Sequence, residues 1–275
     1  MTERAAPELR LESVSHVYLQ GGVCALDEVS LTIGPGEAVA LVGQNGSGKT
    51  TLVRHLNGLL RPTGGSVRLD GVDAGTMTVA GLARRVGLVF QDPDRQIFSG
   101  SVRREVEFGA ANIGLSGEAR RAAVERALRA TGLDGDAGTN PYDLGGARRK
   151  LLALASVLAM ETPVLVLDEP TTGQDASGVE RVRDIVASVA DAGRTVVAIS
   201  HDMRFVAETF ERVVVMRAGQ VILDGTPQRV FADDARDVLG STYLEPPLAA
   251  LVGHRLGLGS TPTDGELVRA LRGAG

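Results

Sequence analysis

The chain alternates short apolar runs with longer amphipathic stretches. Residues 37–42 (EAVALV) and 164–168 (VLVLD) are almost entirely apolar, which predicts strands that are buried on both faces. Residues 9–33 have the pattern of two or three strands of an antiparallel ribbon, with a QGG turn. Further strands are predicted at 66–71 (SVRLDG), 86–91 (VGLVFQ) and 195–200 (TVVAIS), and a hairpin at 212–225 (RVVVMRAGQVILDG).

Helical periodicity dominates from about residue 92 to residue 160. In SGEARRAAVERALRATGL the residues Ala119, Ala123, Ala127 and Leu128 fall on one stripe of a helix. Strands alternate with helices on both sides of this region, which indicates a mostly parallel sheet with a helical insertion. Another helix is predicted after the loop that follows residue 42, and it ends at Gly58. Further helices are predicted over 151–160, 176–192 and 202–210.

These elements predict an α/β fold class in two parts. Residues 1–235 would hold a mixed sheet core and an antiparallel β subdomain, with an α-helical subdomain inserted at about 92–160. Residues 236–275 contain prolines and several glycines between short helical stretches, so a short C-terminal helical extension is expected there.

Composition and charge exclude several classes of protein. The 275 residues are 43% hydrophobic, enough for a sizeable core. A net charge of −5 and a pI near 5.5 argue against a nucleic-acid partner, which needs a basic surface. Cys24 is the only cysteine, so an internal disulfide is impossible. The start, MTERAAPELRLES, lacks the apolar core of a signal peptide. No apolar run approaches the roughly 20 residues of a membrane span.

GQNGSGKT at 43–50 fits the phosphate-loop pattern G-x-x-x-x-G-K-[ST], with a strand before it and a helix after it. Lys49 would reach the β and γ phosphates and the Thr50 hydroxyl would bind Mg²⁺. Tyr18 precedes a Gly turn and is predicted to stack on an adenine, with a core aromatic as the alternative. The predicted nucleotide-binding loop consists of Gly43, Gln44, Asn45, Gly46, Ser47, Gly48, Lys49, Thr50 and Thr51.

Polar residues follow three of the predicted strands directly. Because ligands bind at the carboxyl ends of parallel strands, these residues are expected to meet. Asp168 would hold Mg²⁺ and Glu169 would polarise the attacking water. His201 would contact the γ-phosphate, and Gln91 would complete the magnesium shell. The predicted metal site is therefore Thr50, Gln91 and Asp168.

Together these motifs resemble an ABC-type nucleotide-binding subunit over about residues 9–235. The resemblance implies ATP and Mg²⁺ as ligands, Glu169 and His201 as catalytic residues, and Gln91 as the Q-loop glutamine. It also implies a dimer that holds two ATP molecules, each between one subunit's phosphate loop and the other's LSGGQ signature. The matching positions here are Leu144, Gly145, Gly146, Ala147 and Arg148.

This signature is degenerate. Gly145 replaces the serine whose hydroxyl would bond the partner's γ-phosphate, Ala147 replaces a glycine, and Arg148 replaces the glutamine. The chain's own phosphate loop, Glu169 and His201 are intact. We therefore expect a second ABC ATPase subunit as partner, with a heterodimer favoured over a homodimer.

Three segments resemble the ATPases of energy-coupling factor importers, including the cobalt and nickel group: residues 87–109, residues 168–175 and residues 200–231. That resemblance implies a D-loop at Gly173, Gln174 and Asp175. It implies ATP-driven uptake of a vitamin or a transition-metal ion, through closure and reopening of the dimer. It also implies a peripheral position on the cytoplasmic face of the cell membrane.

The same resemblance implies two membrane partners, a transmembrane coupling protein and a substrate-binding membrane protein. The acids Asp92, Asp94, Glu105 and Glu107 would receive basic helices of the coupling protein, with a solvated acidic surface as the alternative. Other open interpretations are an ATPase of another ABC transporter class, a soluble ABC ATPase of DNA repair or translation, and a nucleotide-gated subunit with little turnover. The acidic pI argues against the soluble class.

Overall fold

The computed structural model describes residues 5–273 and contains two sheets. The smaller sheet is antiparallel, in the order β2-β1-β4-β5, and consists of β1 (Leu9–Tyr18), β2 (Val23–Ile33), β4 (Gly64–Leu69) and β5 (Val72–Asp73). The larger sheet has the order β10-β9-β3-β8-β7-β6. Its strands are β3 (Ala38–Val42), β6 (Val86–Val89), β7 (Val164–Asp168), β8 (Thr195–Ile199), β9 (Arg212–Arg217) and β10 (Gln220–Gly225). These strands are parallel except β10, which pairs antiparallel with β9.

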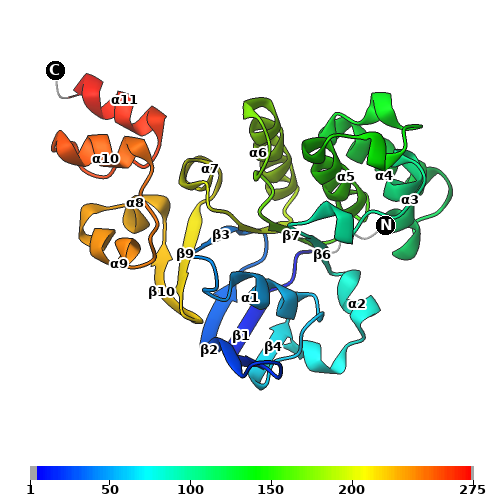
Figure 1. Cartoon of the computed structure of the whole chain (residues 1–275), viewed down its shortest axis with the longest axis horizontal. Helices are drawn as coiled ribbons and strands as arrows, with labels where there is room; N and C mark the ends of the chain where they lie inside the picture. Colours follow the sequence, from blue (N-terminus) through cyan, green and yellow to red (C-terminus); the bar gives the residue numbers. More distant parts are fainter. Residues whose placement is uncertain (1–4, 274–275) are drawn as a thin grey trace.

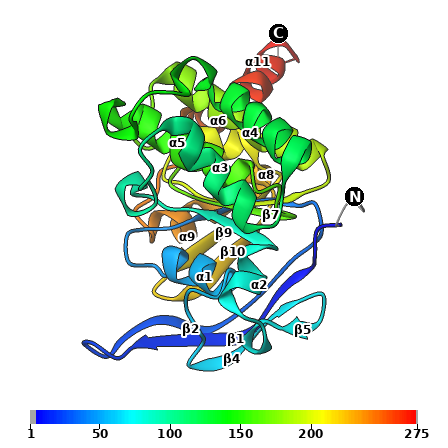
Figure 2. The same ribbon diagram turned by 90° about the vertical axis from the view of Figure 1, so that its right-hand side faces the viewer.

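Helices cover the larger sheet on the side away from the antiparallel sheet (Figures 1 and 2). The green helices α3, α4 and α5 form one group, and the orange and red helices from α8 to α11 lie at the opposite end (Figure 1). The helices are α1 (Lys49–Leu56), α2 (Val79–Ala83), α3 (Val102–Asn112), α4 (Gly117–Thr131), α5 (Gly146–Leu158), α6 (Ala176–Asp191), α7 (Met203–Thr209), α8 (Pro227–Val230), α9 (Arg236–Gly240), α10 (Leu248–Arg255) and α11 (Asp264–Gly273).

Each face of the larger sheet has its own hydrophobic core. Val164 and Val166 of β7 point into a core shared with α1 and the antiparallel sheet. Leu165 and Leu167 point the other way, into the core beneath the helices. Successive strand residues face opposite sides, so a central strand covered on both faces is apolar at every position. This confirms the interpretation of the VLVLD run.

The predicted α/β architecture is confirmed, including the antiparallel subdomain and the helices between β6 and β7. Three short elements, β5, α2 and α8, were not predicted because they are too brief to show a period. One predicted core position is wrong, since Ala119 is exposed. The buried face of α4 begins at Ala123 and also includes Val124, because only this part of the helix packs against its neighbours.

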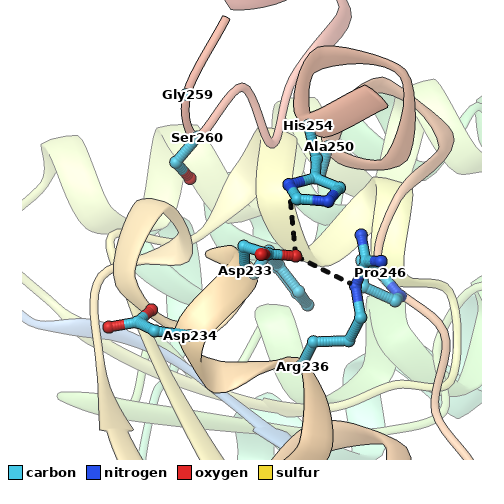
Figure 3. Close-up of a pocket in the computed structure, with 9 residues that line it drawn as sticks. Asp233, Asp234, Arg236, Pro246, Ala250, His254, Gly259 and Ser260 are labelled. Atoms are coloured by element: carbon cyan, nitrogen blue, oxygen red, sulfur yellow. Dashed lines mark ion pairs between the residues drawn. The ribbon is translucent and has the colours of Figure 1, made fainter. Parts of the chain in front are cut away.

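Side-chain contacts attach the C-terminal helices to the rest of the chain. Asp233 lies between two basic side chains, 3.1 Å from His254 Nδ1 and 3.4 Å from Arg236 Nε (Figure 3). Asp264 of α11 pairs at 2.7 Å with Arg204 of α7. Within residues 5–273, no helix combines the length and the apolar character needed to cross a membrane. Residues 1–4 of the first predicted part and residues 274–275 of the second lie outside the described residues.

Candidate nucleotide site

The loop between β3 and α1 has a backbone that only glycine tolerates at two positions. Gly43 has φ 148° and Gly48 has φ 103°, values that residues with a side chain rarely adopt. A Cβ atom on Gly43 would also collide with the carbonyl oxygen of Met216, and one on Gly48 with that of Ala25. The phosphate-loop glycines therefore keep the loop tightly against neighbouring strands.

Lys49 lies at the first turn of α1 and is 6% exposed. Its ammonium donates hydrogen bonds to the carbonyl oxygens of Gly43 at 2.6 Å and Gln44 at 2.9 Å. Burial lowers the pKa of Lys49, while the carboxylates of Glu169 and Asp168 oppose this shift. The loop thus folds around a positive charge at the start of a helix, an arrangement that binds phosphate.

Asp168 is the last residue of β7 and Glu169 follows it; they are 5% and 4% exposed. The hydroxyl of Thr50 donates to Asp168 Oδ2 at 3.2 Å, which brings together two of the predicted magnesium ligands. Asp168 Oδ1 is buried and has no hydrogen-bond partner among residues 5–273. Mg²⁺ prefers carboxylate and hydroxyl oxygens, so this oxygen pair fits the ion.

Burial raises the pKa of Glu169, and the neighbouring charge of Asp168 raises it further. Its Oε1 atom lies 3.0 Å from His201 Nε2. Burial and the charge of Lys49 lower the pKa of His201, so the imidazole is neutral at pH 7. A carboxylate with a raised pKa beside a neutral imidazole is suited to accept a proton near neutral pH.

One cavity of about 250 Å³ collects most of the predicted site. Tyr18 lies at its edge, where its hydroxyl is 3.1 Å from Thr51 Oγ1. Gly43 and Gln44 do not line this cavity, and Val23, Ala25 and Ile199 line it without having been predicted. The predicted residues that line it are Tyr18, Asn45, Gly46, Ser47, Gly48, Lys49, Thr50, Thr51, Gln91, Asp168, Glu169 and His201.

The degenerate signature lies outside this cavity, at the start of α5. Gly145 is the N-cap of the helix, and Gly145 and Gly146 are exposed. Leu144 is buried. Arg148 forms an ion pair with Asp136 and donates to the Gly132 carbonyl at 3.3 Å. Its charge is therefore partly neutralised by this chain's own carboxylate.

The predicted D-loop contacts the signature of the same chain. Gln174 Nε2 donates to the carbonyl oxygen of Ala147 at 2.9 Å. Asp175 caps the N-terminus of α6 by accepting from the Gly178 N–H at 2.8 Å, and this hydrogen bond lowers its pKa. Gly173 precedes them with φ 78°.

One of the four predicted surface acids is not on the surface. Glu105 is 2% exposed and accepts hydrogen bonds from the N–H groups of Phe98 and Ser99, at 3.1 and 2.8 Å. It stabilises the 98–99 turn instead, because its helix begins directly after this turn. The prediction that Glu105 receives a partner is therefore wrong. Asp92 and Asp94 remain exposed.

Comparison with known proteins decides the family. The family model described as "ABC transporter" matches residues 26–172, which include the predicted phosphate loop, the predicted signature and both carboxylates. The chain belongs to the ABC transporter family. It is an ATPase of the ABC type, with the P-loop cassette fold of that family.

Several relatives of this ABC protein are known. It is 42% identical over 274 residues to the "energy-coupling factor transporter ATP-binding protein EcfA2" of Symbiobacterium thermophilum, covering 95% of this chain and 94% of that protein. It is 41% identical over 244 residues to an ABC transporter ATP-binding protein of Methanosarcina acetivorans, covering 89% of this chain but only 39% of that longer protein. CbiO1 of Clostridium perfringens, described as part of the ABC transporter complex cbiONQ, has a TM-score of 0.74 and 35% identity, with coverage of 90% and 98%.

Proposed function

We propose that this ABC protein binds and hydrolyses ATP to drive an energy-coupling factor importer for a vitamin or a transition-metal ion. The convergence of Lys49, Asp168, Glu169 and His201 on one cavity carries the proposal. The likeness to the EcfA2 protein and to CbiO1 supports the importer class. The chain would bind a coupling protein and a substrate-binding membrane protein from the cytoplasmic face of the membrane.

The cavity side chains divide the hydrolytic work. Lys49 and the loop N–H groups bind the phosphates of ATP, and Tyr18 stacks on the adenine. A magnesium ion held by Thr50, Asp168 and Gln91 would offset the phosphate charge when bound. Glu169 takes a proton from the attacking water, which adds to the γ-phosphorus as ADP leaves.

His201 has a different task from Glu169 in this proposal. Its Nε2 atom is 3.0 Å from the Glu169 carboxylate, so the ring limits where that carboxylate can point. As a neutral imidazole it also presents a hydrogen-bonding nitrogen to the γ-phosphate without adding a second positive charge near Lys49.

We further propose a two-part organisation, with a nucleotide-binding domain over 1–235, including the helical subdomain at about 92–160, and an extension over 236–275. The domain would act as a dimer in which each signature serves the ATP of the other subunit. The exposed start of α5, away from the chain's own cavity, supports this arrangement. Because only the signature is degenerate, a partner with a complete signature would restore one fully competent site.

Gly145→Ser should raise MgATP turnover by the purified chain. The new hydroxyl supplies one hydrogen bond to a charged phosphate, about 1.5–3 kcal/mol, which corresponds to about a 10- to 150-fold higher rate if it is felt in the transition state. The serine fits, because nothing lies within 4 Å of a Cβ atom at this position. Phosphate release is measured with Glu169→Gln as the blank.

Gly145→Ala is the matched control, since it adds the same Cβ atom without the hydroxyl and should leave turnover low. An equal increase in both variants would mean that backbone stiffening, rather than the hydroxyl, limits the unaltered chain. If the unaltered chain already turned over as fast as the serine variant, the case for a heterodimer would be lost.

A separate apolar groove supports the membrane partner. Phe98 and Phe108 are 59% and 47% exposed, and their rings meet edge to face with centroids 4.6 Å apart. They line a cavity of about 490 Å³ together with Leu88, Phe90 and Met160. The exposed acids Asp92 and Asp94 lie in the same segment. We propose that an amphipathic helix of the coupling protein, apolar on one face and basic on the other, binds here.

Phe98→Asp should reduce co-purification with the coupling protein by about 10-fold or more. An aromatic side chain that becomes buried in an interface contributes about 2 kcal/mol or more to binding. ATP binding should be unchanged, since Phe98 does not line the nucleotide cavity. Val72→Asp, at a residue 50% exposed on the antiparallel sheet, is the control. Unchanged assembly in the Phe98 variant would show that the partner binds elsewhere.

A further inference from the structure

Lys49 and Lys150 are the only lysines among the 29 basic residues of the chain. Lys49 belongs to the phosphate loop, and Lys150 is in the second turn of α5, after the signature. They are 101 positions apart, yet the carboxylates of Glu169 and Asp168 act on the pKa of both. In a chain that otherwise uses arginine, both lysines are found beside one pair of acids.

Lys150 contacts the backbone of Glu169. Its ammonium donates to the Glu169 carbonyl oxygen at 3.3 Å, and the two residues line a narrow cleft with Asp168 and Pro170. Burial lowers the pKa of Lys150, an effect that the nearby carboxylates of Glu169, Asp168 and Asp92 oppose. The half-buried ammonium therefore lies near enough to these acids for their charges to act on it.

The backbone of Glu169 needs such support. Its φ of 54° is in the left-handed region, where a residue with a side chain is strained and stays only if its surroundings enforce it. Its N–H donates to the Ile199 carbonyl at 3.0 Å. Its carbonyl accepts two long hydrogen bonds, from Thr172 N at 3.4 Å and from Lys150 Nζ at 3.3 Å. Without Lys150, the carbonyl would keep only the long turn hydrogen bond.

We propose that Lys150 is a positioning residue for the catalytic Glu169. This inference rests on the proposed ATPase mechanism and adds a residue to it. The ammonium holds the strained peptide so that the carboxylate stays aimed at the attacking water. A compact ammonium suits one carbonyl in a narrow cleft better than a planar guanidinium does, which accounts for a lysine in an arginine-rich chain.

Lys150 also connects the two regions of the chain that would act on ATP, because it lies on the signature helix α5 and contacts the catalytic Glu169. Helix α5 begins at the signature, which would contact the partner's ATP. The Gln174 hydrogen bond to the Ala147 carbonyl is a second contact between the start of α5 and the segment after β7. A shift of α5 on closure of the dimer would therefore move the support of this chain's own catalytic carboxylate.

The test compares Lys150→Met, Lys150→Arg and the control Arg121→Met, which removes an exposed positive charge from the same helical subdomain. Lys150→Met should lower kcat by about 10- to 100-fold, the size expected when a catalytic group is displaced by about 1 Å. KM for MgATP should stay within about threefold, because ground-state binding is untouched. Lys150→Arg should recover part of the rate.

A purely structural role predicts a different result, in which KM and the melting temperature change along with kcat. That result, or an unaltered kcat in Lys150→Met, would overturn the inference. Both the unaltered chain and the Gly145→Ser chain serve as parents. If neither parent hydrolyses MgATP, alone or together with its partner ATPase subunit, the proposed function is refuted and this inference with it. An active parent with an equally active Lys150→Met variant refutes the inference alone.

Because the chain has only two lysines, the surroundings of Lys150 can also be measured without an activity assay. Labelling lysine with ¹³C at Cε should give one signal for each of the two lysines, and Lys150→Met assigns them by removing one. Glu169→Gln should shift the Lys150 signal in the absence of nucleotide, because it removes the adjacent charge. An unmoved signal would contradict the placement of the ammonium beside the Glu169 carboxylate, on which the positioning role depends.

Discussion

Glu169→Gln is expected to stop ATP hydrolysis while ATP remains bound. Loss of a general base costs about 10²- to 10⁴-fold in rate, and the amide cannot take the proton from water. Binding should survive, because the amide keeps the size of the side chain and the phosphate contacts come from the loop. Phosphate release and equilibrium ATP binding are measured on the same preparations.

The control for this variant is Glu118→Gln, which makes the same chemical change on a side chain that is 85% exposed on α4. It should hydrolyse ATP like the unaltered chain. A general base accelerates a reaction by at least about 100-fold. If the Glu169→Gln variant kept more than about one tenth of the parent rate, a group other than Glu169 would have to accept the proton from water. His201 would then be the residue to examine, because it is 3.0 Å away.

Lys49→Ala is expected to weaken ATP binding by about two to four orders of magnitude. The ammonium would make charged hydrogen bonds to two phosphates, each worth about 1.5–3 kcal/mol, and each 1.4 kcal/mol is tenfold in affinity. Its removal also takes away a buried positive charge on which the Asp168 and Glu169 carboxylates act. Isothermal titration with MgATP measures the loss.

Arg68→Ala is the control for the loss of one positive charge, since Arg68 is a half-exposed cation paired with Glu12 on the antiparallel sheet. It should bind ATP normally. Because Lys49 also bonds to the carbonyls of Gly43 and Gln44, a melting curve must show that the alanine variant is folded. Affinity within tenfold of the parent would mean that the loop N–H groups bind the phosphates unaided.

Most of the fold was predictable because it depends on local pattern. The runs at 37–42 and 164–168 have the pattern of strands covered on both faces, and the structure buries them in two separate cores. Short elements such as β5 could not be predicted, because two residues carry no period. The exposure of Ala119 was mispredicted for a related reason. An apolar stripe marks the side of a helix that can be buried, whereas packing against neighbouring elements decides which positions of that side are buried.

The candidate site likewise has a part that could be predicted from the sequence and a part that could not. A phosphate loop is a contiguous motif whose glycines, lysine and threonine have their roles by spacing alone, so Gly43 to Thr51 could be recognised directly. Glu105 has the same charge as Asp92 and Asp94, but its carboxylate is turned inward to two backbone N–H groups. Nothing in the sequence separates these acids, because the turn that Glu105 supports is formed only in three dimensions.

The sequence by itself determined the α/β class and predicted the phosphate loop, the polar residues at the strand ends and the degenerate signature, since each depends on residues close together in the chain. Only the tertiary structure decided which of these residues meet. It placed Tyr18, Lys49, Asp168 and His201 around one cavity and left the signature outside. It also brought Lys150 to the carbonyl of Glu169. Parallel strands gather their carboxyl ends at one edge of the sheet, but the packing of α5 against that edge depends on distant side chains throughout the core.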